Sequence, residues 1–123
     1  MMDMKERDLK QRTKRFALHV VRFCESLPKD ETSKILGRQL LRSGTAVGAN
    51  YRAVCRAKST ADFISKFGTV LEEADESAYW MELLVDACKV TEEATAALLR
   101  EANELVAISV SSINTARKGK GAT

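Results

Sequence analysis

The chain has 123 residues, of which 45% are hydrophobic and 30% are charged, and it carries a net charge of +3. This length suits one domain with a single core, and the apolar fraction excludes a chain too polar to fold. A β-sheet protein needs many turns, which are rich in proline and glycine, and this chain has only one proline and six glycines. We therefore expect long helices joined by short loops.

The first helix is predicted over residues 8–27. Its apolar residues recur at spacings of seven, four, three and four, which places them on one side of a helix: Leu9, Phe16, Val20, Phe23 and Leu27. Pro28 follows and cannot continue the helix, because it lacks a backbone N–H and restricts the residue before it.

The second helix is predicted over residues 31–57, with Asp30 or Thr32 as its N-cap. Its main apolar seam consists of Leu36, Leu40, Ser43, Val47, Asn50 and Val54. Beside that seam lie Gly37, Gly44 and Gly48, although a glycine inside a helix costs about 1 kcal/mol relative to alanine. This stripe indicates a surface where another helix backbone comes close. The alternative is that Ser43 and Gly44 only mark a bend.

The third helix is predicted over residues 60–89, where Ser59 and Asp62 form a capping box. Its seam is the longest in the chain: Phe63, Phe67, Val70, Ala74, Ser77, Met81, Leu84 and Cys88. Tyr79 and Trp80 are adjacent and therefore point about 100° apart on a helix. One of them should lie at the edge of the bundle or against a second copy. The alternative is a bulky shoulder on a wide core.

The fourth helix is predicted over residues 92–116, after the N-cap Thr91. Its buried side contains Ala94, Leu98, Leu105, Ile108 and Ile113. Residues 118–123 read as a flexible basic tail. Because short connections make neighbouring helices antiparallel, we expect an all-α, up-down-up-down four-helix bundle, with residues 1–117 as one domain.

The charges are divided unevenly along the chain. Residues 1–58 contain fourteen Lys or Arg against six Asp or Glu, and residues 59–123 contain six against eleven. The two halves either neutralise each other when they fold side by side or leave a basic surface for a polyanion.

An arginine stripe on the second helix bears on whether these charges pair with each other or form a basic surface. At 100° per residue, four arginines fall within about 40° of one direction: Arg38, Arg42, Arg52 and Arg56. The third helix offers an acidic stripe of Glu72, Glu76, Glu82 and Asp86, with Glu73 and Asp75 beside it. We expect the two stripes to pair, within a subunit or across an interface, because a half-buried guanidinium needs a partner.

Nothing in the sequence indicates an active site or a cofactor. His19 is the single histidine and lies next to a core position, so a partly buried histidine without ligands is expected. Glu73 and Glu76 share a helical face, but the Glu-x-x-His pairs of a di-metal bundle are missing. We expect no enzyme, no cofactor and no metal.

Three features indicate a cytoplasmic protein without a membrane partner. No apolar run reaches the length of a membrane span, and the charged segment 1–15 has no apolar stretch behind it of the signal-peptide kind. Cys24, Cys55 and Cys88 are odd in number and widely spaced, so they are expected to be small buried thiols.

Several motifs together are highly specific. They are the run 40–52 (LLRSGTAVGANYR), Arg56-Ala-Lys-Ser59, Asp62-Phe-Ile and the run 73–80 (EADESAYW), with supporting matches at 12–18 and at Leu27-Pro28. Over residues 8–115 the chain closely resembles the bacterial four-helix bundle proteins, also called 23S rRNA intervening-sequence proteins and historically S23 ribosomal proteins. A related branch comprises the accessory variability proteins of diversity-generating retroelements.

The resemblance implies a four-helix bundle that assembles as a homopentameric ring. In the retroelement branch it implies a basic barrel that binds nucleic acid and a reverse transcriptase. We expect structural or interface roles for the residues that carry the match or line the stripes: Arg38, Arg42, Gly44, Gly48, Asn50, Tyr51, Arg52, Arg56, Glu73, Glu76, Tyr79 and Trp80.

The expected function is that of a homo-oligomeric binding protein that contacts rRNA or other nucleic acid. The alternative is a scaffold that binds a protein partner and no nucleic acid. A nucleic-acid contact should use charges that the acidic third helix does not neutralise. These are Lys10, Arg12, Lys14, Arg15, Arg117, Lys118 and Lys120, which an up-down-up-down bundle would bring to one end.

Overall fold

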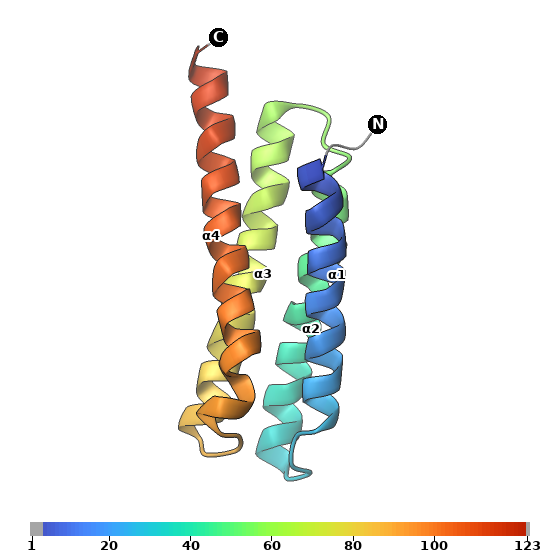
Figure 1. The fold of residues 1–123 in the computed structure, drawn as a ribbon, viewed down its shortest axis with the longest axis vertical. Coiled ribbons are helices and arrows are strands. Elements are labelled where there is room, and N and C mark those ends of the chain that lie inside the picture. Colours follow the sequence, from blue (N-terminus) through green and yellow to red (C-terminus); the bar gives the residue numbers. More distant parts are fainter. Residues whose placement is uncertain (1–3, 123) are drawn as a thin grey trace.

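The computed structural model describes residues 4–122, and the side chains of residues 8–119. This part of the chain forms four α-helices and no strand, which confirms the predicted all-helical class. The helices are α1 (Met4–Glu25), α2 (Glu31–Val54), α3 (Thr60–Asp86) and α4 (Glu92–Ala122). In Figure 1 the α1–α2 and α3–α4 connections lie at one end of the molecule, and the α2–α3 connection lies at the other.

The three predicted N-caps are confirmed. Asp30, Ser59 and Thr91 each accept a hydrogen bond from the backbone N–H three residues further on, at 3.0–3.1 Å. Each side chain therefore satisfies one of the amides that a helix leaves unpaired in its first turn. Thr32, the other candidate for the start of α2, lies inside the helix.

Three helices end earlier than predicted. α1 ends at Glu25 rather than at residue 27, α2 at Val54 rather than 57, and α3 at Asp86 rather than 89. After α2 the chain forms a turn that is tighter than an α-helix, because the N–H groups of residues 56 and 57 bond to carbonyls three residues back at 3.1 and 3.0 Å. After α3, Cys88 adopts the left-handed conformation with φ 61° and terminates the helix.

The fourth helix runs further than predicted. α4 continues to Ala122, past the expected end at residue 116 and through most of the segment expected to be a flexible tail. No proline interrupts this segment, and its two glycines weaken a helix without ending it.

The glycine stripe is a helix–helix contact within the subunit, so the prediction of a close approach is confirmed. A Cβ atom at Gly44 would lie 2.7 Å from both γ carbons of Val20 on α1, and one at Gly37 would lie 2.8 Å from Leu27 Cδ1. At Gly48 it would lie 3.3 Å from the carbonyl oxygen of Thr13. The glycines bring α1 against α2, which leaves them unavailable as an interface with a second copy.

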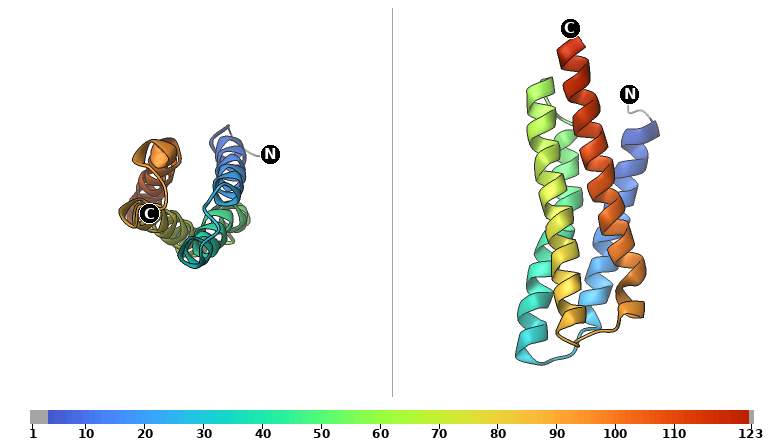
Figure 2. Two further views of the ribbon diagram at one scale, coloured as in Figure 1. Left: turned by 90° about the horizontal axis from the view of Figure 1, so that it is seen from below. Right: turned by 90° about the vertical axis from the view of Figure 1, so that its left-hand side faces the viewer.

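The core lies between the four helices, but the bundle is open on one side. The largest fully buried side chains are Phe16, Leu40, Met81, Leu84 and Leu105, and they come from all four helices. Each helix packs closely on its neighbours in the sequence, whereas α1 and α4 contact each other only sparsely. The end-on view in Figure 2 shows this gap between α1 and α4.

Among the described residues, none of the four helices combines the length and the apolar character that crossing a bilayer requires.

Two alanine substitutions test the close approach at Gly44. Gly44→Ala places a methyl group against Val20, which is fully buried and β-branched and so cannot turn away. Gly68→Ala is the matched control, since no heavy atom lies within 4 Å of the added Cβ. We expect Gly68→Ala to raise the free energy of unfolding by about 0.5–1 kcal/mol. Gly44→Ala should fall below that control by about 1–3 kcal/mol in urea denaturation. Equal stabilisation by both substitutions would contradict the close contact.

Candidate nucleic-acid interface

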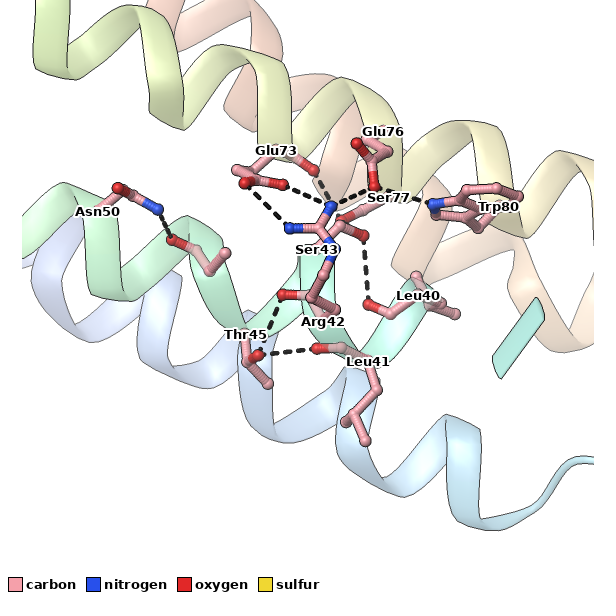
Figure 3. Close-up of polar contacts among 11 residues, drawn as sticks. Leu40, Leu41, Arg42, Ser43, Thr45, Asn50, Glu73, Glu76, Ser77 and Trp80 are labelled. Carbon is pink, nitrogen blue, oxygen red and sulfur yellow. Dashed lines mark hydrogen bonds and ion pairs between the residues drawn. The ribbon is translucent and has the colours of Figure 1, made fainter. Parts of the chain in front are cut away.

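One arginine of the predicted stripe pairs with α3. Arg42 donates to Glu73 through both Nη atoms, at 3.1 and 3.3 Å, and contacts Glu76 through Nη2 (Figure 3). The ion-pair prediction is therefore confirmed for Arg42, Glu73 and Glu76. The pair of carboxylates considered as a metal site is bound to this guanidinium.

The contact between α2 and α3 continues around this ion pair. The indole N–H of Trp80 donates to Glu76 Oε2 at 3.1 Å, and this bond, followed by Arg42, lowers the pKa of Glu76. The hydroxyls of Ser43 and Ser77 lie 2.9 Å apart in the buried seam between the two helices (Figure 3). Trp80 is half-buried, and Tyr79 is the aromatic residue at the edge, with 55% of its surface exposed.

The other three arginines of the stripe behave differently. Arg38, Arg52 and Arg56 are exposed and form no ion pair with any described residue. Within the subunit, the predicted pairing is therefore wrong for them. They are not half-buried as expected, because α2 is rotated so that only Arg42 faces α3.

The α1 cluster also differs from the prediction. Arg12 is not available to a ligand, because its guanidinium binds two carboxylates of α4. Its Nε and Nη2 donate to Glu101 at 2.7 and 2.8 Å, and Nη2 also donates to Glu104 at 2.6 Å. The bidentate bond to Arg12 lowers the pKa of Glu101. Arg12 links the two helices that otherwise contact each other sparsely.

The remaining cations of the cluster are free of such bonds. Lys14 and Arg15 are exposed, and Lys10 is half-buried. None of the three forms an ion pair within residues 8–119. Arg15 lies close enough to Glu101 for its charge to favour the ionised carboxylate.

The basic residues near the end of α4 do not meet this cluster. Arg117 is thirteen residues beyond Glu104, which contacts Arg12, so it lies about 20 Å further along α4. Ala116 and Gly119 line a cavity of about 900 Å³ together with the α2–α3 connection, including Lys58. Figure 2 shows the end of α4 rising beyond the start of α1. The predicted convergence into one patch is wrong.

The unpaired cations therefore form two separate basic groups. One is the α1 group of Lys10, Lys14 and Arg15. The other is the α4-end group of Lys58, Arg117 and Lys118, all exposed and without an ion pair in the described structure. Lys120, also predicted here, has its side chain outside the described residues. Sequence reasoning missed Lys58, although its place just before the N-cap Ser59 puts it in the α2–α3 connection.

The other residues of the expected interface have roles inside the subunit. Tyr51 is buried, with its ring centroid 5.7 Å from that of Phe67. Asn50 donates to the carbonyl of Ala46 at 2.8 Å, within its own helix (Figure 3).

The histidine and the cysteines are placed differently from the predictions. His19 is exposed rather than partly buried, and it lines the groove between α1 and α4. Cys88 is exposed because α3 ends before it, so the prediction of a buried thiol is wrong there. Burial raises the pKa of Cys24 to about 11, which makes it a poor nucleophile. In the described part of the chain, no group of three His, Cys, Asp or Glu is placed to hold a metal ion.

Two comparisons with known proteins point to the same family. Residues 5–111 match the family described as 23S rRNA-intervening sequence protein. A similar solved structure is the crystal structure of a protein with unknown function from the S23 ribosomal protein family of Bacteroides thetaiotaomicron. It has 34% identity and a TM-score of 0.79, over 85% of this chain and 97% of that chain. A search of curated proteins finds no match.

Removing the Arg12 bridge should destabilise the fold. We expect Arg12→Gln to lower the free energy of unfolding by about 1 kcal/mol, because it leaves Glu101 without its bidentate partner. Lys14→Gln removes the same charge from an exposed, unpaired position and should change stability by less than about 0.5 kcal/mol. The measurement is chemical denaturation at several pH values.

The pH dependence gives this prediction a second test. The folded pKa of Glu101 is lowered, so the stability it supplies is present above its unfolded pKa of about 4.3 and is lost as pH falls through the lower folded value. The difference between wild type and Arg12→Gln should therefore shrink over that range. A difference that stays constant into strong acid would contradict the assignment.

Proposed function

This chain belongs to the 23S rRNA-intervening sequence protein family, and on that premise we propose that it is a non-enzymatic homo-oligomer that contacts rRNA or other nucleic acid through basic surfaces. The observation that carries the proposal is a set of unpaired cations in two groups, one midway along α1 and one around the end of α4. Lys14 and Arg15 lie on α1, and Lys58, Arg117 and Lys118 lie around the end of α4. Exposed lysines and arginines without carboxylate partners are the groups that displace counterions from a phosphate backbone.

The non-enzymatic part rests on how the candidate catalytic groups are used. Glu73 and Glu76 are bound to Arg42, and the thiol of Cys24 has a raised pKa. These groups serve the α2–α3 contact and the core rather than a reaction.

The homo-oligomer we propose is a pentameric ring, as the resemblance of the sequence implies. Each subunit would then contribute one copy of both basic groups to the ring. Repetition converts weak single contacts into measurable avidity along one nucleic-acid strand.

Assembly can be tested directly by light scattering coupled to size exclusion. We expect the wild-type chain at micromolar concentration to run at about five times its single-chain mass of 13.6 kDa. A mass of 13.6 kDa throughout a dilution series would overturn the proposed assembly.

Nucleic-acid binding can be tested with a labelled 23S rRNA fragment and with single-stranded RNA and DNA of the same length. We expect wild-type binding to weaken steeply with salt. Lys14→Gln/Arg15→Gln should lower the slope of log affinity against log salt by about 0.7 for each phosphate that the variant no longer neutralises. Arg22→Gln/Lys29→Gln is the matched control, since it removes two exposed, unpaired charges near the C-terminal end of α1.

Two results would count against nucleic-acid binding through the α1 group. They are no wild-type binding at low salt, and an equal weakening in the control variant. The first result, with the oligomer intact, would favour the scaffold alternative, for which the exposed Tyr79 offers a contact residue.

A further inference from the structure

Two exposed faces of the subunit carry opposite charges that no described residue neutralises. We call the first the α2 outer face; it contains Arg38, Leu41, Arg52 and Arg56. We call the second the α3 outer face; it contains Glu72, Asp75, Tyr79, Glu82 and Asp86. All nine side chains are exposed, and none of the charged ones forms an ion pair within the described structure.

The Ser43–Ser77 contact shows where these faces point. Those two hydroxyls, 2.9 Å apart, mark the line along which α2 and α3 touch. At 100° per residue, Arg38 and Arg52 point about 140° and 180° away from Ser43 on α2, and Arg56 follows just beyond the end of that helix. The four carboxylates point about 140–180° away from Ser77 on α3. The two faces therefore lie on opposite sides of the α2–α3 pair and cannot meet within one subunit.

Each face also carries one large exposed hydrophobic side chain among its charges. Leu41 is 38% exposed and Tyr79 is 55% exposed. Leu41 points about 160° from Ser43, and Tyr79 points about 160° from Ser77, so each lies within its own face. An exposed hydrophobic side chain among charged ones is a common feature of protein–protein contacts.

The two faces also match in length. Arg38 and Arg52 are fourteen residues apart, or about 21 Å along α2. Glu72 and Asp86 are fourteen residues apart, or about 21 Å along α3. Neither face needs to bend to lie along the other.

We propose that the α2 outer face of one subunit docks on the α3 outer face of a second copy of this chain. The inference rests on the proposed homo-oligomer and names the surfaces that build it. A polyanion would satisfy the arginines but leave the acidic face uncompensated, whereas a second copy satisfies both. Because two different patches meet, the contact is head-to-tail, and repeating it closes a ring when the rotation permits.

Charge reversal tests this contact. Arg38→Glu/Arg52→Glu changes the net charge of the α2 outer face from +3 to −1, so that both faces are acidic. Glu72→Lys/Glu82→Lys/Asp86→Lys changes that of the α3 outer face from −4 to +2, so that both faces are basic. We expect each of these variants to run as a single chain of 13.6 kDa in light scattering, with an unchanged helical circular dichroism spectrum. The variant that combines all five substitutions reverses both faces together and should recover the wild-type mass. Arg22→Glu/Lys29→Glu is the control, because it reverses exposed charges outside either face.

Mixing gives an additional result that a merely destabilised variant would not produce. The α2-face variant and the α3-face variant, mixed in equal amounts, should associate with each other in alternation. Alternation around a closed ring requires an even number of subunits, so the mixture should not reproduce a five-membered wild-type mass.

These experiments distinguish a failure of the proposed assembly from a failure of the proposed contact. A wild-type monomer would overturn the proposed assembly and this contact together. A wild-type oligomer whose α2-face and α3-face variants keep its full mass would overturn this contact alone. Loss of RNA binding in Arg38→Glu/Arg52→Glu at unchanged mass would assign the α2 outer face to a polyanion instead.

Discussion

The close approach of α1 to α2 is the constraint on which the rest of the structure depends. Val20 occupies the space where any side chain at position 44 would be, and Leu27 and Thr13 stand in the same relation to Gly37 and Gly48. α1 is held against α2 and α4 packs on α3, whereas α1 and α4 contact each other only sparsely. A groove of about 480 Å³ lies between α1 and α4 and is lined by Phe16, Phe23 and Leu98.

The charges of the chain are used in two different ways. Arg12 and Arg42 each bind two carboxylates of another helix, so these charges hold helices together inside the subunit. The exposed arginines of α2 and the outer carboxylates of α3 are left over because helix rotation turns them away from each other. The excess of positive charge in residues 1–58 and of negative charge in residues 59–123 therefore persists as separate faces on the folded surface.

Features fixed by local sequence could be predicted, and features fixed by the rotation of one helix against another could not. The caps Asp30, Ser59 and Thr91 bond to amides three residues away, so their roles follow from neighbouring residues alone. The glycine stripe predicts a helix–helix contact, because glycines inside a helix lower its stability and a close contact compensates for that loss. In contrast, Arg38 and Arg52 point only about 40° and 80° away from Arg42 around α2. The spacing of residues in the sequence does not define the rotation of α2 closely enough to predict which arginine faces α3. The prediction for Arg12 is wrong because its carboxylate partners on α4 lie far away in the sequence.

The ion pair between Lys89 and Asp30, with Nζ and Oδ1 3.2 Å apart, has a consequence for how the chain folds. Asp30 caps α2 through Ser33, a contact that the α1–α2 hairpin can make alone. Its contact with Lys89 requires the α3–α4 hairpin to be present and correctly docked, because Lys89 lies in the connection between those helices. One carboxylate thus takes part in a local contact and in a long-range one. Asp30 and Lys89 are 59 residues apart, so their contact costs far more loop-closure entropy than the cap does.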